Sequence, residues 1–152
     1  MAIERQTLRR SAWLPLAVTL LLVCGVGYAT EHGFPPIISA GFEAYKKGGA
    51  SSAIDAWLVG SPMAGDKAAQ SQAATLNGIE AYYGKFQDAE LIRSYRLSPS
   101  STLTFMEARY EKGVGFMKFL TFRAGKKEGI TQFLFHTQPE QILPSELLYP
   151  DP

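Results

Sequence analysis

The chain has 152 residues, of which 46% are hydrophobic and 19% are charged, a composition typical of one globular domain and too apolar for a disordered chain. The 15 lysines and arginines nearly balance the 14 acidic residues, so the formal net charge is only +1. Such a small charge produces no strong field to attract DNA, RNA or an anionic membrane surface. We therefore expect no nucleic-acid partner.

The first 29 residues have the pattern of a secretory signal peptide. Three arginines within the first ten residues precede an uncharged apolar run, and Gly27 and Ala29 are small residues at the positions that a signal peptidase reads. We expect cleavage after Ala29 and a periplasmic or secreted domain, with residues 30–35 as a linker. The alternative is an uncleaved anchor at residues 11–29, which is just long enough to span a bilayer. In both cases the domain lies outside the cytoplasm, and only an uncleaved segment would hold it on a membrane.

Residues that commonly carry catalysis or bind metals are scarce. Cys24 is the only cysteine and lies in the predicted signal, so the mature chain would have no disulfide, thiol nucleophile or cysteine-based metal site. His32 and His136 are far apart in the sequence and do not have metal-ligand spacing. No Ser-His-Asp set or Gly-x-Ser-x-Gly elbow can be assembled. We expect no metal, no cofactor and no assignable catalytic residue.

From Pro36 to about Gly84 the apolar residues recur with helical spacing and predict three helices. The first ends at Gly48-Gly49, the second ends at Gly60-Ser61-Pro62, and the third begins at an Asp66 cap and ends at Gly84. Their apolar stripes are Ile38, Phe42 and Tyr45; Ile54, Trp57 and Leu58; and Ala69, Ala73, Leu76, Ile79 and Tyr83.

After Gly84 the pattern changes to the alternation that is typical of strands. The four predicted strands are Ala89–Leu97, Thr102–Lys112, Val114–Arg123 and Gly129–Thr137. Their short connections require antiparallel neighbours, since a parallel return needs a long crossover. The predicted fold class is therefore α+β, with three N-terminal helices packed on a four-stranded antiparallel meander over residues 36–143. The proline-rich end of the chain, including a tail at residues 144–152, is predicted to lie extended on the surface or to trail free.

A Gly-x-Gly at residues 113–115, with a lysine on either side, has the composition of a phosphate-binding loop. Such a loop needs a helix directly after it, but the following FMKFLTF is strand-like. The segment therefore predicts a hairpin, with a two-residue turn at Lys112-Gly113 that pairs Glu111 with Val114.

This hairpin, with Arg123 opposite Gly129 in the next one, assigns the strand residues to two faces of the sheet. The face predicted to pack on the helices holds Met106, Ala108, Tyr110, Met117, Phe119, Phe133 and Phe135. The other face mixes apolar and polar residues: Leu103, Phe105, Glu107, Arg109, Phe116, Lys118, Leu120, Phe122, Gln132, Leu134 and His136. Glu107 is predicted to lie opposite Lys118 as a cross-strand ion pair.

The mixed face allows two interpretations. It is either a solvated surface with ordinary ion pairs, or an interface for a homodimer or another protein partner, because a sheet face this apolar is rarely left bare. The candidate interface residues are Phe105, Glu107, Arg109, Phe116, Lys118, Leu120 and Leu134.

The segments AWLVGSP, YYGKF, LSPSSTL, YEKG and FLFHT resemble, in order and spacing, a group of small uncharacterised exported bacterial proteins. The fold predicted for that group is nuclear-transport-factor-2-like (NTF2-like), of the cystatin-like superfamily, and the resemblance covers Ile38 to Leu143. It implies an apolar pocket between helices and concave sheet, with the candidate lining residues Trp57, Tyr82, Tyr83, Met106, Tyr110, Met117 and Phe133. Ketosteroid isomerases of this superfamily use an acid and a tyrosine in the pocket. No acid shares the sheet face of Tyr110, although Glu80 could reach it from a helix.

We favour a non-catalytic exported module that binds a small apolar ligand or a protein partner through the pocket or the sheet face. One alternative is a pocket isomerase or hydrolase of a small apolar substrate, with Glu80 or Glu107 beside a tyrosine. The other is a helical adaptor, because AGFEAYKKGGASSAIDAWL followed by GDKAAQ resembles a Sel1-type or tetratricopeptide-like repeat. Repeat architectures need about three units, whereas residues 98–137 have a strand pattern.

Overall fold

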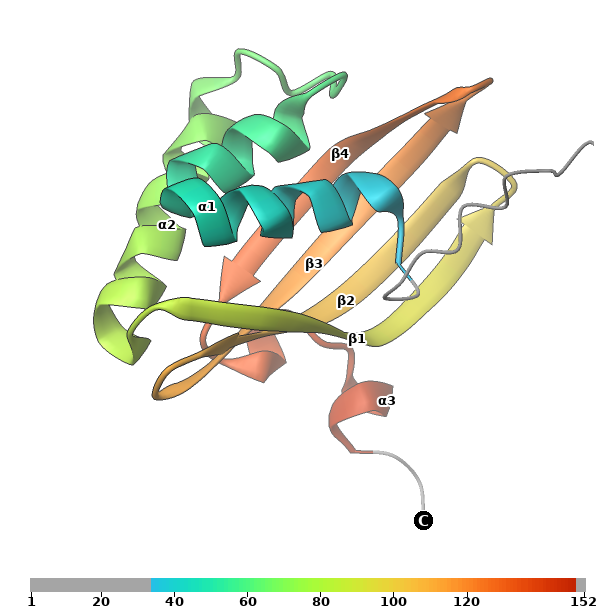
Figure 1. The fold of residues 1–152 in the computed structure, drawn as a ribbon. Helices are drawn as coiled ribbons and strands as arrows, with labels where there is room; N and C mark the ends of the chain where they lie inside the picture. Colours follow the sequence, from blue (N-terminus) through green and yellow to red (C-terminus); the bar gives the residue numbers. More distant parts are fainter. Residues whose placement is uncertain (1–33, 150–152) are drawn as a thin grey trace, which may run out of the picture.

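The computed structural model describes residues 34–149. The predicted signal peptide or anchor, Cys24 and His32 lie outside this range. The described chain has an α+β fold in which two long helices cover one face of a four-stranded antiparallel sheet (Figure 1).

Two long helices replace the three that the sequence pattern predicts. Helix α1 spans Pro36–Leu58 and helix α2 spans Lys67–Tyr83. The predicted break at Gly48-Gly49 is a kink within α1, where Gly49 has φ 74° and ψ −170°. A glycine adopts this conformation without steric cost, so the chain changes direction there and resumes its helix at once. The predicted Asp66 cap is confirmed, since its carboxylate accepts a hydrogen bond of 2.8 Å from the Ala68 N–H.

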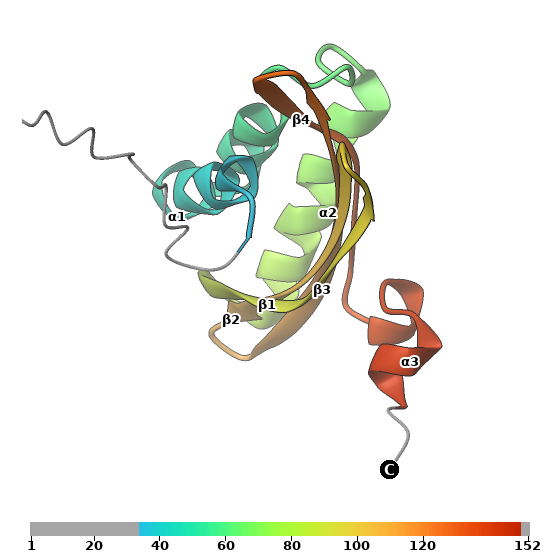
Figure 2. The same cartoon turned by 90° about the vertical axis from the view of Figure 1, so that its right-hand side faces the viewer.

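The four strands form a meander in the predicted order. They are β1 Phe86–Ser98, β2 Ser101–Tyr110, β3 Gly113–Ala124 and β4 Lys127–His136, and each pairs antiparallel with the next. Bulges interrupt the pairing of β1 with β2 and the pairing of β3 with β4. Such irregularities increase the twist and bend the strands, and Figure 2 shows the sheet curving around the helices.

The β2–β3 turn is displaced by one residue from its predicted position. Tyr110 pairs with Gly113, so the turn consists of Glu111 and Lys112. Gly113 is required inside the strand because a Cβ there would overlap the Tyr83 ring on α2. In addition, the Lys112 N–H donates a hydrogen bond of 2.8 Å to the Tyr83 carbonyl. Packing against α2 therefore sets the turn.

This displacement changes cross-strand partners but not faces. Glu107 lies opposite Phe116, and Lys118 lies opposite Phe105, so the predicted Glu107–Lys118 pair is wrong. The β3–β4 pairing departs from prediction only near its turn. Arg123 lies opposite Glu128, and the predicted register begins at Leu120–Gln132, after a bulge.

The prediction of the inward face is confirmed. All seven of its residues are buried: Met106, Ala108, Tyr110, Met117, Phe119, Phe133 and Phe135. Trp57 of α1 packs on this face with its ring centroid 5.0 Å from that of Phe119. Its indole N–H donates to the Ile38 carbonyl at 3.0 Å, and its ring occupies the space that a side chain at Gly41 would need. The main core therefore lies between the two helices and the concave side of the sheet.

The proline-rich segment after β4 was expected to be extended or free, and for the described residues up to Tyr149 this prediction is wrong. After β4 the chain forms a 3-10 helix, η1 Pro139–Gln141, and a short helix, α3 Ser145–Leu148. Figure 2 shows this segment on the side of the sheet opposite α1 and α2. Ile142 and Leu143 are buried there against Phe105 and form a second, smaller apolar cluster. We call Pro139–Leu148 the C-terminal strap.

Candidate functional site

The predicted pocket residues lie at three different depths in the structure. Trp57, Met106 and Met117 have no exposed surface, and Tyr110 and Phe133 are also buried in the main core. Tyr83 is half-buried at the edge of the core. Tyr82 points outward and is 76% exposed. The chain's own side chains thus occupy much of the concave side, where the resemblance implies a pocket.

A pair of buried tyrosine hydroxyls lies within this core. The hydroxyl oxygens of Tyr45 on α1 and Tyr110 on β2 are 3.5 Å apart, and the Tyr45 hydroxyl is also 3.3 Å from the Leu76 carbonyl, to which it donates. The Tyr45 ring stacks on Phe86 at a centroid distance of 4.5 Å. Tyr45 was predicted only as part of a helical stripe, because nothing local in the sequence indicates that its hydroxyl meets one from β2.

Glu80 of α2 contributes to the electrostatics of this tyrosine pair. Burial raises the pKa of Tyr45 far above its usual value, and interactions with Tyr110 and Glu80 raise it further. Burial also raises the pKa of Tyr110 to about 12, although its hydrogen bond with Tyr45 acts in the opposite direction. Both hydroxyls are therefore neutral near pH 7 and can act as hydrogen-bond donors. Because Tyr45 and Tyr110 are only 2% and 6% exposed, neither is available to a solute in this conformation.

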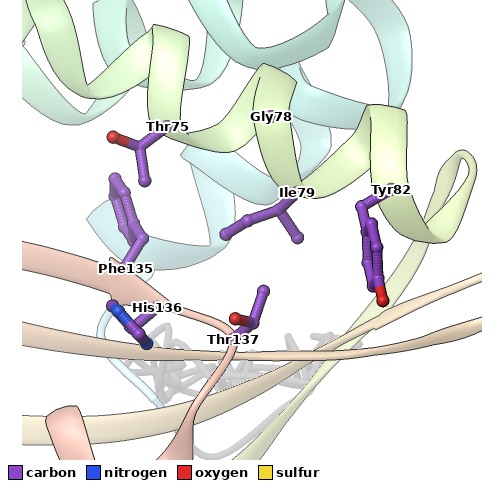
Figure 3. Close-up of a pocket in the computed structure, with 7 residues that line it drawn as sticks. All are labelled: Thr75, Gly78, Ile79, Tyr82, Phe135, His136 and Thr137. Carbon is purple, nitrogen blue, oxygen red and sulfur yellow. The ribbon is translucent and has the colours of Figure 1, made fainter.

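A shallow groove lies between α2 and the end of β4 (Figure 3). Its floor is apolar, with Ile79 and Phe135, and its rim carries the polar side chains of Thr75, Thr137 and Tyr82. The groove has a volume of about 210 Å³. Pockets for drug-sized ligands usually enclose about 300–1,000 Å³, so this one suits only a small fragment or a single side chain.

The outward face of the sheet has a covered part and an open part. The strap covers Phe105, which is 4% exposed, and packs against Ile92, Leu103 and Phe116. Two of the candidate interface residues, Phe105 and Phe116, therefore contact the chain's own C-terminal segment. The only sequence signal for the strap is two apolar pairs, Ile142-Leu143 and Leu147-Leu148. Their spacing matches neither the alternation of a strand nor the period of a long helix.

The open part is apolar, and its residues come from β1, β3 and β4. We define the open patch as Tyr95, Leu120, Phe122 and Leu134. Tyr95, Phe122 and Leu134 are 38%, 44% and 37% exposed. The Tyr95 ring contacts the edge of Phe105 at a centroid distance of 6.1 Å, so the open patch continues directly into the covered part.

Arg109 and two acidic residues of β1 form a charged cluster on the outward face. Arg109 lies 2.9 Å from Asp88 and 2.6 Å from Glu90, both on β1. Partial burial alone would raise the pKa of Asp88, but a hydrogen bond from the Ala89 N–H and the nearby Arg109 and Lys46 lower it overall. Arg109, a candidate interface residue, is thus engaged by acids of β1.

Within residues 34–149, no three His, Cys, Asp or Glu side chains are grouped so that they could hold a metal ion. None of the helices in this range is both long enough and apolar enough to cross a bilayer.

Comparison with known proteins found no matching family model, no matching curated protein and no matching solved structure. The chain's own residues are therefore the basis for its proposed function.

Proposed function

We propose that this chain is an exported, non-catalytic binding module with an NTF2-like fold, and that it binds a protein partner through the outward face of its sheet. The observation that carries the proposal is the open patch, in which Tyr95, Phe122 and Leu134 are all more than a third exposed on one face. Exposed apolar clusters with polar residues around them are typical of protein-binding surfaces.

The surroundings of the open patch favour a protein partner over a small ligand. Lys118 and Gln132 lie among its apolar residues, opposite Leu134 and Leu120 respectively. Mixed aromatic and polar character is typical of interfaces between proteins that also exist separately. By contrast, Trp57 and its neighbours fill the concave side, and the groove beside α2 is small.

A second candidate is a pocket enzyme, and the observation that favours it is the influence of Glu80 on Tyr45 and Tyr110. An acid beside a hydrogen-bonded tyrosine pair has the chemistry needed to move a proton on a small apolar substrate. This candidate requires the core to open, because both tyrosines are buried. We therefore place it second.

Site-specific photo-cross-linking tests the proposed surface. A photoreactive amino acid would replace Phe122 in the full chain, expressed in the organism that makes it, and a matched control would carry it at Asn77, an exposed position on α2. We expect a discrete cross-linked protein from position 122 that disappears when Leu134→Ser is added. Identical products from both positions, or none from position 122, would contradict the proposal.

Native mass spectrometry of the same purified protein distinguishes the second candidate. A small apolar molecule that co-purifies with the parent and is lost in Tyr110→Phe would favour the pocket enzyme or a small-ligand binder. Protein without such a molecule, together with the cross-link from position 122, would favour the protein-binding module.

A further inference from the structure

The C-terminal strap, which lies on the side of the sheet away from the long helices, packs there through apolar side chains (Figure 2). Its backbone hydrogen bonds close its own turns, since the Ile142 and Leu143 N–H groups donate to the Pro139 carbonyl at 2.9 and 2.7 Å. Within residues 34–149, no hydrogen bond or ion pair joins the strap to a strand. The strap can therefore leave the sheet as a unit without breaking a hydrogen bond to it.

The surface beneath the strap and the open patch form one apolar face. Leu103 packs against the strap's cluster, and it lies opposite Tyr95 on one side and Leu120 on the other. Both of these partners belong to the open patch. The Tyr95 ring also lies 6.1 Å from the ring of Phe105, which the strap covers. Detachment of the strap would therefore join Phe105 and Phe116 to the open patch in one continuous surface.

The open patch by itself is small for a stable protein interface. It has only a few apolar side chains, whereas a specific interface usually buries about 800 Å² on each partner and involves about 20–30 residues of each. Once the strap is detached, the covered part adds further apolar side chains: Ile92, Leu103, Phe105 and Phe116. A partner that uses both parts would contact a larger and uninterrupted apolar surface.

The strap itself shows which chemistry the covered part accepts. Ile142 and Leu143 directly follow the single turn of η1, and they are 5% and 9% exposed in one cluster with Phe105. Leu147 and Leu148 of α3 pack against the same cluster. A short helical segment with adjacent aliphatic side chains therefore fits this face.

We infer that the strap is a displaceable internal ligand, and that the partner binds by putting a segment of the same chemistry, a short helical turn with two adjacent aliphatic side chains, in its place. This inference depends on the proposed function, because it names the partner's docking segment and the step that regulates binding at the same face. The apparent affinity for the partner is scaled by the fraction of molecules whose strap is detached. Loosening the strap should therefore strengthen binding.

Fluorescence anisotropy tests the displacement with a defined probe, a labelled synthetic peptide of residues 139–149. The full chain carrying Ile142→Ala and Leu143→Ala should bind this peptide at least about tenfold more tightly than the parent, because its own strap competes less. The matched control is Gln141→Ala, an exposed position in the same strap, which should bind the peptide as the parent does. A second peptide that carries the same two alanine substitutions should bind neither protein.

Equal affinity of the parent and the double variant for the first peptide would overturn the inference, and so would binding of the second peptide as tightly as the first. Circular dichroism checks that the double variant is folded. If it is not, Leu148→Ala, at a half-buried position beside the same cluster, makes the same comparison with a smaller expected gain of about threefold.

The photo-cross-link from position 122 separates this inference from the proposed function. In the full chain with the loosened strap, we expect the same cross-linked protein as in the parent, in greater yield. If the product is the same but its yield is unchanged or lower, the strap is not displaced by the partner, and the proposed function stands without this inference. If neither chain gives a specific cross-link from position 122, both fail.

Discussion

The packing of the strap on the sheet predicts a measurable contribution to stability from Ile142. This side chain is 5% exposed in a cluster with Phe105 and Leu143. Truncating a buried isoleucine to alanine typically costs about 2–5 kcal/mol. The strap lies at the surface and its short helices can move toward Phe105, so we place Ile142→Ala at the low end, about 2 kcal/mol.

A ceiling on this loss follows from the structure. Ile142 and Leu143 belong to a cluster separate from the main core, so the strap can detach while the helices and sheet stay folded. Adding Leu143→Ala to Ile142→Ala should therefore lower the free energy of unfolding by less than Leu143→Ala would alone, because the two side chains share neighbours. Once the strap has detached, a further truncation in it has no effect. Deletion of the chain after Gln138 sets the ceiling.

The assay is urea unfolding followed by circular dichroism, with Glu140→Ala as an exposed control in the same strap. If Ile142→Ala changes the free energy of unfolding by less than about 0.5 kcal/mol, as a surface substitution would, the packing of the strap is refuted. If the double variant has a free energy of unfolding well below that of the deletion variant, the strap is not independent of the main core.

Four other substitutions test local features of the fold. Gly113→Ala should destabilise the protein by about 1–3 kcal/mol, because a Cβ at this position would overlap the Tyr83 ring on α2. The control is Gly78→Ala, where a Cβ would have no atom within 4 Å, and it should stabilise α2 by up to about 1 kcal/mol. Equal effects of the two substitutions in urea unfolding would contradict the register. The pKa of Tyr110 is raised from 10.0 to about 12, so its contribution to stability is full below pH 10 and is lost as pH rises toward 12. Tyr110→Phe should make the unfolding free energy fall less steeply over that interval, and an unchanged slope would argue against its burial. Ser61→Ala should cost about 1–3 kcal/mol, because the Ser61 hydroxyl donates to the Ile130 carbonyl in a buried site; thermal melts with no shift would exclude that bond.

The sequence alone determined that a helical segment precedes a four-stranded antiparallel meander, and it determined the two faces of the sheet. Short connections allow only antiparallel neighbours, and side chains alternate along a strand, so moving a turn by one residue changes partners but not faces. For this reason Met106, Met117 and Phe119 were assigned correctly to the core although the β2–β3 turn was misplaced. The Asp66 cap was likewise readable, since a cap depends on neighbouring residues only.

Only the tertiary structure decided features that depend on residues distant in sequence. Glycine is a common turn residue, yet Gly113 lies in β3, and its contact with Tyr83 sets that position. The kink at Gly49 could equally have been a full break, because glycine permits either and packing chooses. The strap has too few apolar residues for a period, and its burial becomes evident only beside Phe105.

The candidate sites show the same division. The sequence placed Leu120 and Leu134 on the outward face, but it could not show that the strap would cover Phe105 and leave them in an open patch. The sequence also could not predict the contact between the hydroxyls of Tyr45 and Tyr110, because these residues lie on different elements 65 positions apart. Local periodicity determines which way a side chain points, whereas the folded chain determines what it meets there.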